Sequence, residues 1–288
     1  MAGSDGLCFF VSDLHGKSHR YEALFRAILH ERPEIVLLGG DLLPLHGAFS
    51  GEWKGDFIRD FLNAQFQNLK QSLKDDYPQV FLILGNDDPK TEEAGIEEGE
   101  QQGVWTYLHN KKTEIHQRPL YGYACVPPTP FRLKDWERYD VSRYADPGCI
   151  EPPEGWHSTP VSDSEVKYST IEKELNKLAG KEDLSKAVFL FHTPPYHTNL
   201  DRAALDGKAI DHAPLDVHVG SIAVRRFIET RQPLLTLHGH IHESTRITGS
   251  WKDRIGRTWM FSAAHDGAEL ALVRFRIDDL DAATRELL

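Results

Sequence analysis

The fold class is decided by the stretch Leu7-Cys8-Phe9-Phe10-Val11-Ser12-Asp13-Leu14-His15, in which a short apolar run leads into two side chains that can bind a metal. A continuous apolar run is typical of a buried strand in an α/β sheet, and ligands gather beyond the carboxyl ends of such strands. Four more runs end in the same way: residues 35–38 before Asp41, 80–84 before Asn86, 187–191 before His192, and 234–237 before His240 and His242. The pattern predicts an α/β protein with one polar site at the ends of these strands.

The donor types at these endings indicate the kind of metal. Imidazole, carboxylate and amide groups without a thiolate suit borderline to hard divalent ions rather than a structural cysteine-type zinc site. Mn is the metal we expect, with Fe, Zn, Co or Ni as alternatives. Seven donors are too many for one tetrahedral ion, but they suit two ions that share a carboxylate. We expect glycines to supply the backbone freedom that aims the paired donors, at positions 16, 39, 40, 85 and 239.

Five motifs occur in a set order between residues 7 and 242: Asp13-Leu14-His15, Gly40-Asp41, Gly85-Asn86-Asp87-Asp88, His192, and Gly239-His240-Ile241-His242. Together they resemble the signature of the calcineurin-like metallophosphoesterase superfamily. The branch that this chain resembles best is that of predicted phosphoesterases related to the bacterial cyclic-nucleotide phosphodiesterase. Its fold would be a four-layer α/β/β/α sandwich of two mixed β-sheets flanked by helices.

The resemblance implies a role for each donor. Asp13, His15 and His242 would hold one metal, Asn86, His192 and His240 the other, and Asp41 would bridge the two ions. Two cations roughly 3.5–4 Å apart can hold a hydroxide as nucleophile and neutralise charge on the phosphoryl oxygens. The expected activity is therefore phosphoester hydrolysis without a covalent intermediate.

Asp87 departs from the family pattern, which usually has His at this position. Members with another residue there often resemble phosphodiesterases, and an ionised Asp87 would repel a dianionic monoester more than a monoanionic diester. With a raised pKa, Asp87 could instead donate a proton to the leaving group. A third interpretation places Asp87 and Asp88, ahead of Pro89, in a solvent-facing turn.

Other subclasses and functions are weakened by particular residues. Pro44 stands where purple acid phosphatases have a Tyr ligand, and Leu84 stands where Ser/Thr protein phosphatases have an Arg. A phosphomonoesterase acting on a small metabolite remains the main alternative, with cations available at Arg132, Lys134, Arg138 and Arg143. A non-catalytic metallophosphoesterase-like scaffold is the other alternative, although the presence of all seven donors speaks against it.

Composition restricts the partners and the setting. The 288 residues include 33 Lys and Arg against 44 Asp and Glu, and a net charge of −11 argues against binding of extended nucleic acid. The substrate we expect is a small phosphoester such as a nucleotide. We expect no signal peptide at the amino terminus, and no run reaches the roughly 18 apolar residues of a membrane span. Three scattered Cys favour a reducing cytoplasm. The sequence makes no prediction of oligomeric state.

Apolar residues at helical spacing predict helices around 21–29 and 57–73, and a third that starts after Ser221 as N-cap. Residues 259–262 and 270–277 look like paired strands of a second sheet. We predict a single metallophosphoesterase domain over residues 1–288. The segment from about residue 88 to residue 186 has the least regular sequence pattern. It would be an insertion that forms a wall or lid over the site.

Several histidines outside the motifs leave alternatives open. Tyr196 and His197 follow His192 closely enough to face a substrate pocket, or they belong to an ordinary surface loop. His218 could be a substrate contact or a second partner for a metal ligand. We interpret His238 as structural or as a partner of a ligand, and His265 as part of a loop near the site.

Overall fold

Two β-sheets form the centre of the protein, described here by a computed structural model over residues 6–45 and 55–288. Residues 1–5, on which the expected absence of a signal peptide rests, lie outside the described part. The first sheet has the strand order β14-β13-β1-β2-β3-β4 and the second β11-β12-β10-β7-β6-β5. Each contains parallel and antiparallel pairs, so both sheets are mixed.

The strands of the first sheet have these bounds: β1 Leu7–Val11, β2 Ile35–Gly39, β3 Gln79–Ile83, β4 Thr106–Tyr107, β13 Ala271–Arg276 and β14 Asp279–Leu287. The strands of the second are β5 Lys111–Ile115, β6 Arg118–Tyr123, β7 Val188–Phe191, β10 Leu235–His238, β11 Lys252–Ile255 and β12 Thr258–Ser262. A small hairpin pairs β8 Ala209–Ile210 with β9 Ala213–Pro214. The sheets pack face to face, and the rings of Phe261 in β12 and Phe275 in β13 lie 5.8 Å apart across the core.

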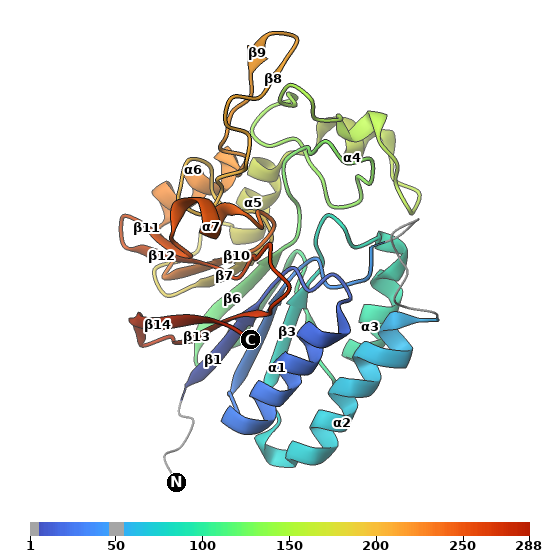
Figure 1. The fold of residues 1–288 in the computed structure, drawn as a ribbon, viewed down its shortest axis with the longest axis vertical. Coiled ribbons are helices and arrows are strands. Elements are labelled where there is room, and N and C mark those ends of the chain that lie inside the picture. The colour runs from blue at the N-terminus through green and yellow to red at the C-terminus, as the bar shows by residue number, and fades with distance from the viewer. Residues whose placement is uncertain (1–5, 46–54) are drawn as a thin grey trace.

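Helices cover the outer faces of both sheets and complete the predicted four-layer α/β/β/α fold (Figure 1). α1 Ser18–Glu31, α2 Ala64–Leu73 and α3 Glu93–Gln101 lie beside the first sheet, and α5 Ile171–Ala179 and α6 Ile222–Arg231 beside the second. Phe227 of α6 packs edge-on against Phe189 of β7, with ring centroids 5.1 Å apart. The shorter helical segments are the π-helix η1 Phe57–Asn63, the 3-10 turns η2 Lys74–Asp76, η3 Lys90–Glu92 and η4 Pro152–Glu154, and the helices α4 Asp163–Tyr168 and α7 Ser244–Thr248.

The predicted helices all exist, with local differences. Ser221 caps α6 as expected, because its hydroxyl accepts from the amide of Val224 at 3.0 Å. Leu29 of the first predicted stripe is 46% exposed, so the stripe that α1 buries is shorter than the pattern indicates. The second predicted helix is divided between η1 and α2.

The prediction that residues 259–262 and 270–277 pair with each other is wrong. β12 lies in the second sheet, where it pairs with β10 and β11. β13 lies in the first sheet, where it pairs with β1 and β14. Neighbouring strands in sequence usually pair, but here the short connection crosses from one sheet to the other.

Residues 88–186 contain three of the sheet strands, so the irregular part is limited to residues 124–170. This segment lies with the β8–β9 hairpin above the carboxyl ends of the strands (Figure 1). The indole of Trp136 donates to the carbonyl of Asp88 at 2.7 Å, and the Asp140 carboxylate accepts from the α6 amides of Ile222 and Ala223 at 2.6 and 3.2 Å. These contacts attach the segment to the body of the protein.

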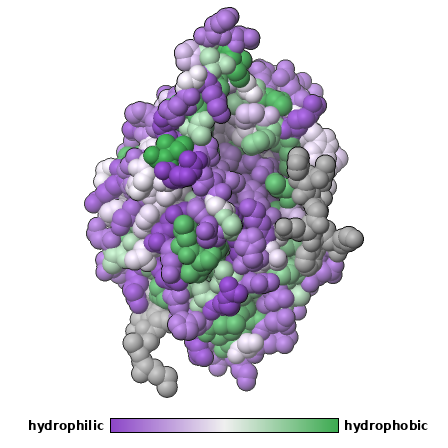
Figure 2. All heavy atoms as spheres, in the orientation of Figure 1, coloured by the Kyte–Doolittle hydropathy of each residue, from purple (hydrophilic) through white to green (hydrophobic). Residues whose placement is uncertain are grey.

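No helix within residues 6–45 and 55–288 is both long and apolar enough to cross a membrane. The face shown in Figure 2 is mostly hydrophilic, and its apolar side chains form small separate patches.

Candidate metal centre

The seven predicted donors lie at the carboxyl ends of β1, β2, β3, β7 and β10. Backbone hydrogen bonds align the loops that carry them. The amide of Asp13 donates to the carbonyl of Gly40 at 2.9 Å, and that of His15 donates to the carbonyl of Asp41 at 2.8 Å. The two sheets meet where the amide of His240 donates to Asp13 Oδ1 at 3.0 Å. Distant parts of the chain therefore converge on one place, as the strand endings predict.

One cluster consists of Asp13, His15, Asp41 and His242, each of which offers an atom within 4.8 Å of the others. The two Nε2 atoms of His15 and His242 lie 3.1 Å apart, and His242 Nε2 lies 3.3 Å from Asp13 Oδ1. Asp13 is fully buried. This arrangement turns nitrogen and oxygen lone pairs toward a common point.

A second cluster consists of Asp41, His192 and His240. Asn86 belongs beside it, because Asn86 Oδ1 lies 3.1 Å from His192 Nε2. Asp41 Oδ2 lies 3.2 Å from the same nitrogen. Among the described residues, Asp41 is thus the one that the two clusters share.

The described side chains fit a pair of divalent ions. His192 Nδ1 lies 2.8 Å from the carbonyl of Gly39, so this nitrogen is the donor and Nε2 is left to face Asp41 and Asn86. A metal-binding His typically has its second ring nitrogen held in this way. The buried Nδ1 of His15 has no hydrogen-bond partner within the described residues, and Asp87 Oδ2 lies 3.7 Å from it. The donor set therefore has the chemistry of a metal centre.

Four of the seven donors also have a strained backbone conformation. Asp13, His15, Asp41 and His240 have positive φ angles of 58°, 48°, 52° and 73°. Residues other than Gly rarely adopt this left-handed region, and strained backbone often occurs at functional sites. The tight turns after the strands thus aim these donors at the cost of local strain.

The expected role of the glycines is only partly correct. Gly16 and Gly40 have positive φ, but Gly39, Gly85 and Gly239 do not. Gly85 and Gly239 are needed for another reason, which is close approach. A Cβ at Gly85 would lie 2.2 Å from Asp41 Oδ1, and one at Gly239 would lie 2.0 Å from the hydroxyl of Ser12.

Gly239→Ala should lower the affinity for Mn²⁺ at least about tenfold, because the added methyl group would also lie 2.7 Å from Asp13 Oδ2 and displace it. Calorimetric titration of the metal-free protein measures this affinity. Gly95→Ala is the matched control, since its Cβ would meet Ile58 at a tolerable 3.3 Å. Equal affinities for the two variants would contradict the role assigned to Gly239.

The electrostatics of the cluster favour ionised carboxylates. Burial alone would raise the pKa of Asp41, but the nearby His192 and His15 outweigh it and lower that pKa to about 2. Burial likewise opposes protonation of His192, yet the Asp41 carboxylate raises the pKa of His192 to about 10. Burial and the charge of His192 lower the pKa of His240 to about 3. A cation bound here would take the place of the His192 proton.

Asp87 lies at the edge of this cluster. Its amide donates to Asp41 Oδ1 at 2.8 Å, and its Oδ1 accepts from the side-chain amide of Asn86 at 3.0 Å. The side chain is 27% exposed. Burial, and then the charge of Asp41, raise the pKa of Asp87 to about 7. Its placement is compatible with a role toward substrate.

Asp88 is a buried structural carboxylate, so the solvent-facing interpretation is wrong for it. Its oxygens accept from the amides of Leu42, Leu43 and Gly85 at 3.1, 2.8 and 2.9 Å. These amides belong to the loops that carry Asp41 and Asn86. Burial and the charge of Asp41 raise the pKa of Asp88 to about 8, while the three amides oppose that rise.

Sequence reasoning also missed Arg20. Its guanidinium donates to the carbonyls of Asp13 and Gly267, both at 2.5 Å, and to that of Ala268 at 3.3 Å. These bonds brace the turn after β1 against a loop near the carboxyl terminus. No sequence signal marks Arg20 or Asp88, because their partners include residues distant in the chain.

The structure also places the four histidines whose roles the sequence leaves open, His197, His218, His238 and His265. His238 is structural, since its ring nitrogens bind the Thr193 carbonyl and the Thr236 hydroxyl at 2.8 and 2.7 Å. His265 lies in a loop, where its Nε2 is 3.1 Å from Glu269. Tyr196, His197 and His218 form a cluster of their own, outside both groups of donors.

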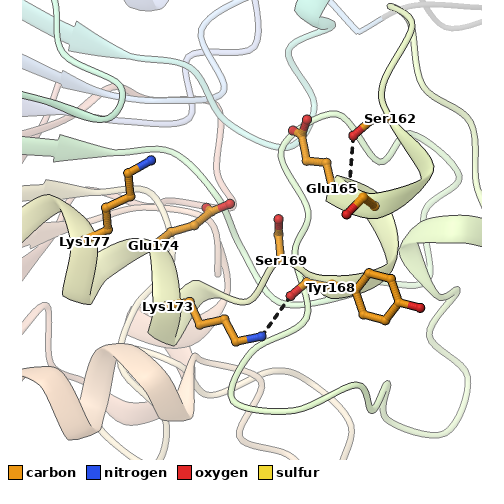
Figure 3. Close-up of a pocket in the computed structure, with 8 residues that line it drawn as sticks. Ser162, Glu165, Tyr168, Ser169, Lys173, Glu174 and Lys177 are labelled. Carbon is orange, nitrogen blue, oxygen red and sulfur yellow. Dashed lines mark hydrogen bonds between the residues drawn. The ribbon is translucent and has the colours of Figure 1, made fainter.

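A cavity of about 460 Å³ lies between α4 and α5 (Figure 3), and none of the seven donors lines it. Glu165 and Glu174 line it, but both pair with the buried Arg138. Lys173 donates to the carbonyl of Tyr168 at 3.2 Å. Most of its charged groups are therefore engaged within the fold, and we assign it no role.

Two facing mixed sheets with a carboxylate shared between two Asp/His clusters define an α/β protein with a candidate binuclear metal site. The chain belongs to the calcineurin-like phosphoesterase family, whose model matches residues 8–244. Membership in this family implies a phosphoester hydrolase that binds divalent metal ions. A search of curated proteins finds no match.

Solved structures with TM-scores above 0.5 share the fold at low identity. One is 14% identical with a TM-score of 0.61, and the comparison covers 98% of both chains. The crystal structure of TT1561 from Thermus thermophilus is 17% identical with a TM-score of 0.57, again over 98% of both chains. A third structure, described as a novel archaeal phosphodiesterase, is 9% identical with a TM-score of 0.44, and the comparison covers 98% of this chain and 99% of that one. A similarity this low carries no argument about this chain.

Proposed function

We propose that the protein is a binuclear metal-dependent phosphodiesterase acting on a small phosphoester. The observation that carries this proposal is the position of Asp41, which belongs to both clusters of donors. Asp13, His15 and His242 would hold one ion, and Asn86, His192 and His240 the other. Mn²⁺ is the ion we propose first, because oxygen and imidazole donors without thiolate suit it.

The bound ions would supply charge neutralisation at the phosphate and activation of a water molecule. The residues of the chain hold the loops that carry the donors. Asp88 keeps the loops of Asp41 and Asn86 together, and Arg20 braces the turn that carries Asp13 and His15. Their buried contacts support a preorganised site.

Three of the four candidate cations, all except the exposed Arg132, are engaged with other groups of the protein, which supports a diester over a monoester. Two of the cations that could neutralise a dianion are already paired. Lys134 pairs with the buried carboxylate of Glu137, and Arg138 pairs with the partly buried carboxylate of Glu174. Arg143 lies over the ring of Tyr168. Asp87 adds negative charge beside Asp41 when ionised. A monoanionic diester would meet less repulsion there than a dianionic monoester.

Metal-stripped protein resupplied with Mn²⁺ should hydrolyse bis(p-nitrophenyl) phosphate with a kcat/KM at least about tenfold above that for p-nitrophenyl phosphate, a difference of about 1.4 kcal/mol in barrier. Asp87→Asn should reduce this preference, since it removes the charge that disfavours the dianion. Initial rates of p-nitrophenol release measure both values. The matched control is Asp75→Asn, at an exposed position outside the site.

A preference for the monoester would support the alternative of a phosphomonoesterase. Protein that binds Mn²⁺ but turns over neither ester would support the non-catalytic scaffold.

A further inference from the structure

A buried carboxylate organises a second group of side chains, in the loop that follows His192 and at His218. Asp201 is fully buried and accepts from the amides of His197, Thr198 and Gly220 at 2.8, 2.9 and 3.2 Å. His218 Nδ1 lies 2.8 Å from Asp201 Oδ1. The carboxylate therefore fixes both the loop after His192 and the orientation of the His218 ring.

The outer nitrogen of His218 is available to a ligand. Because Nδ1 faces Asp201, Nε2 points away from the carboxylate, and it has no hydrogen-bond partner within residues 6–45 and 55–288. The side chain is 21% exposed. An imidazole held through one nitrogen presents the other in a fixed direction.

Three rings gather at this point. The ring centroids of His197 and His218 lie 4.5 Å apart, and those of Tyr196 and His218 lie 6.1 Å apart. The Tyr196 hydroxyl donates to Asp216 at 2.6 Å, and Asp216 also accepts from the amide of His218 at 2.9 Å. His197 has a positive φ of 56°, a strained conformation of the kind that accumulates at functional sites.

The chain links the rings to metal-binding residues at two points. Tyr196 follows His192 by four residues, so the chain between them spans at most about 14 Å. The amide of Arg202 donates to the Ser244 hydroxyl at 3.0 Å, two residues beyond His242, and Arg202 forms a β-bridge with His218. A substrate long enough to span this distance from a phosphate at the donors would reach the rings with its organic part.

We propose that His218, oriented by Asp201, together with Tyr196 and His197 forms the binding site for a nucleobase carried by the phosphodiester substrate. This inference rests on the proposed function and identifies its substrate class. A nucleobase has a planar face that stacks on aromatic rings and an edge that hydrogen-bonds to an imidazole. A sugar phosphate or an alkyl ester has no such face.

The test compares two diesters with the same reporter group, thymidine 5′-(p-nitrophenyl phosphate) and methyl p-nitrophenyl phosphate, on the Mn²⁺-loaded enzyme. His218→Ala should lower the ratio of kcat/KM values, thymidine ester over methyl ester, roughly tenfold. His197→Asn, which removes a ring yet tolerates a positive φ, should lower the ratio in the same direction. His116→Ala, in the turn between β5 and β6, is the matched control and should leave the ratio unchanged.

A second readout does not require turnover. Thymidine added to metal-free protein should shift the NMR signals of the His218 ring, assigned through their loss in His218→Ala. An unchanged ratio together with unshifted signals would overturn this inference while leaving diester hydrolysis intact. If neither ester is hydrolysed, the proposed function fails, and the NMR titration alone decides whether the rings bind a base.

Discussion

Asp41→Asn should reduce the hydrolysis of a phosphodiester by about a thousandfold, the size of effect seen when a group that stabilises transition-state charge is removed. The reason is its unique position, since Asp41 alone belongs to both clusters of donors. The substitution preserves shape but removes the charge that both ions would share. The protein should also retain less Mn²⁺ after dialysis, as measured by elemental analysis.

Measurements of folding and of metal content distinguish a loss of activity caused by the missing charge from one caused by misfolding. Asp41 Oδ1 accepts from the amide of Asp87, a bond that the Asn oxygen can also accept, so the circular dichroism spectrum should be unchanged. Asp75→Asn, an exposed change of the same type, should keep full activity and metal content. An Asp41→Asn enzyme with wild-type rate would overturn the binuclear mechanism.

Asp88→Ala should reduce the free energy of unfolding of the metal-free protein by roughly 3 kcal/mol, because buried amides left without an acceptor cost about 1–3 kcal/mol each. The amides concerned are those of Leu42, Leu43 and Gly85. Their loops carry Asp41 and Asn86, so the affinity for Mn²⁺ should fall as well. Guanidinium denaturation measures the first effect and calorimetry the second.

The neighbouring residue supplies the control. Asp87 is partly exposed and accepts from the Asn86 side chain, so Asp87→Ala should change the free energy of unfolding by less than about 1 kcal/mol. If Asp88→Ala proves as mild as Asp87→Ala, then Asp88 does not hold the two loops together.

For two glycines of the site, the sequence indicates the correct residues but the wrong physical reason, which was backbone freedom. Gly85 and Gly239 have ordinary backbone conformations, and the left-handed angles belong to Asp and His donors instead. What these glycines provide is space for Asp41 and Asp13. Whether space is available depends on how neighbouring residues pack, and a sequence pattern does not report this packing.

The sequence by itself determined the α/β class and the five strand endings where the donors converge. It could do so because buried parallel strands read as local apolar runs, and because the polar residue after each run lies at one edge of a sheet. The motif order further indicated the calcineurin-like phosphoesterase family, which the match over residues 8–244 confirms.

Only the tertiary structure decided which strands share a sheet, that Asp88 and Arg20 brace the donor loops, and that Asp201 orients His218. The amides that donate to the Asp88 carboxylate lie 3 to 46 residues away along the chain, and Asp201, which faces Nδ1 of His218, lies 17 residues away from that histidine. A local sequence pattern indicates the helix or strand to which a residue belongs. A hydrogen bond between two loops depends instead on how the helices and strands pack together. The physical reason is that burial creates the demand for these partners, and burial exists only once the sheets and helices have come together.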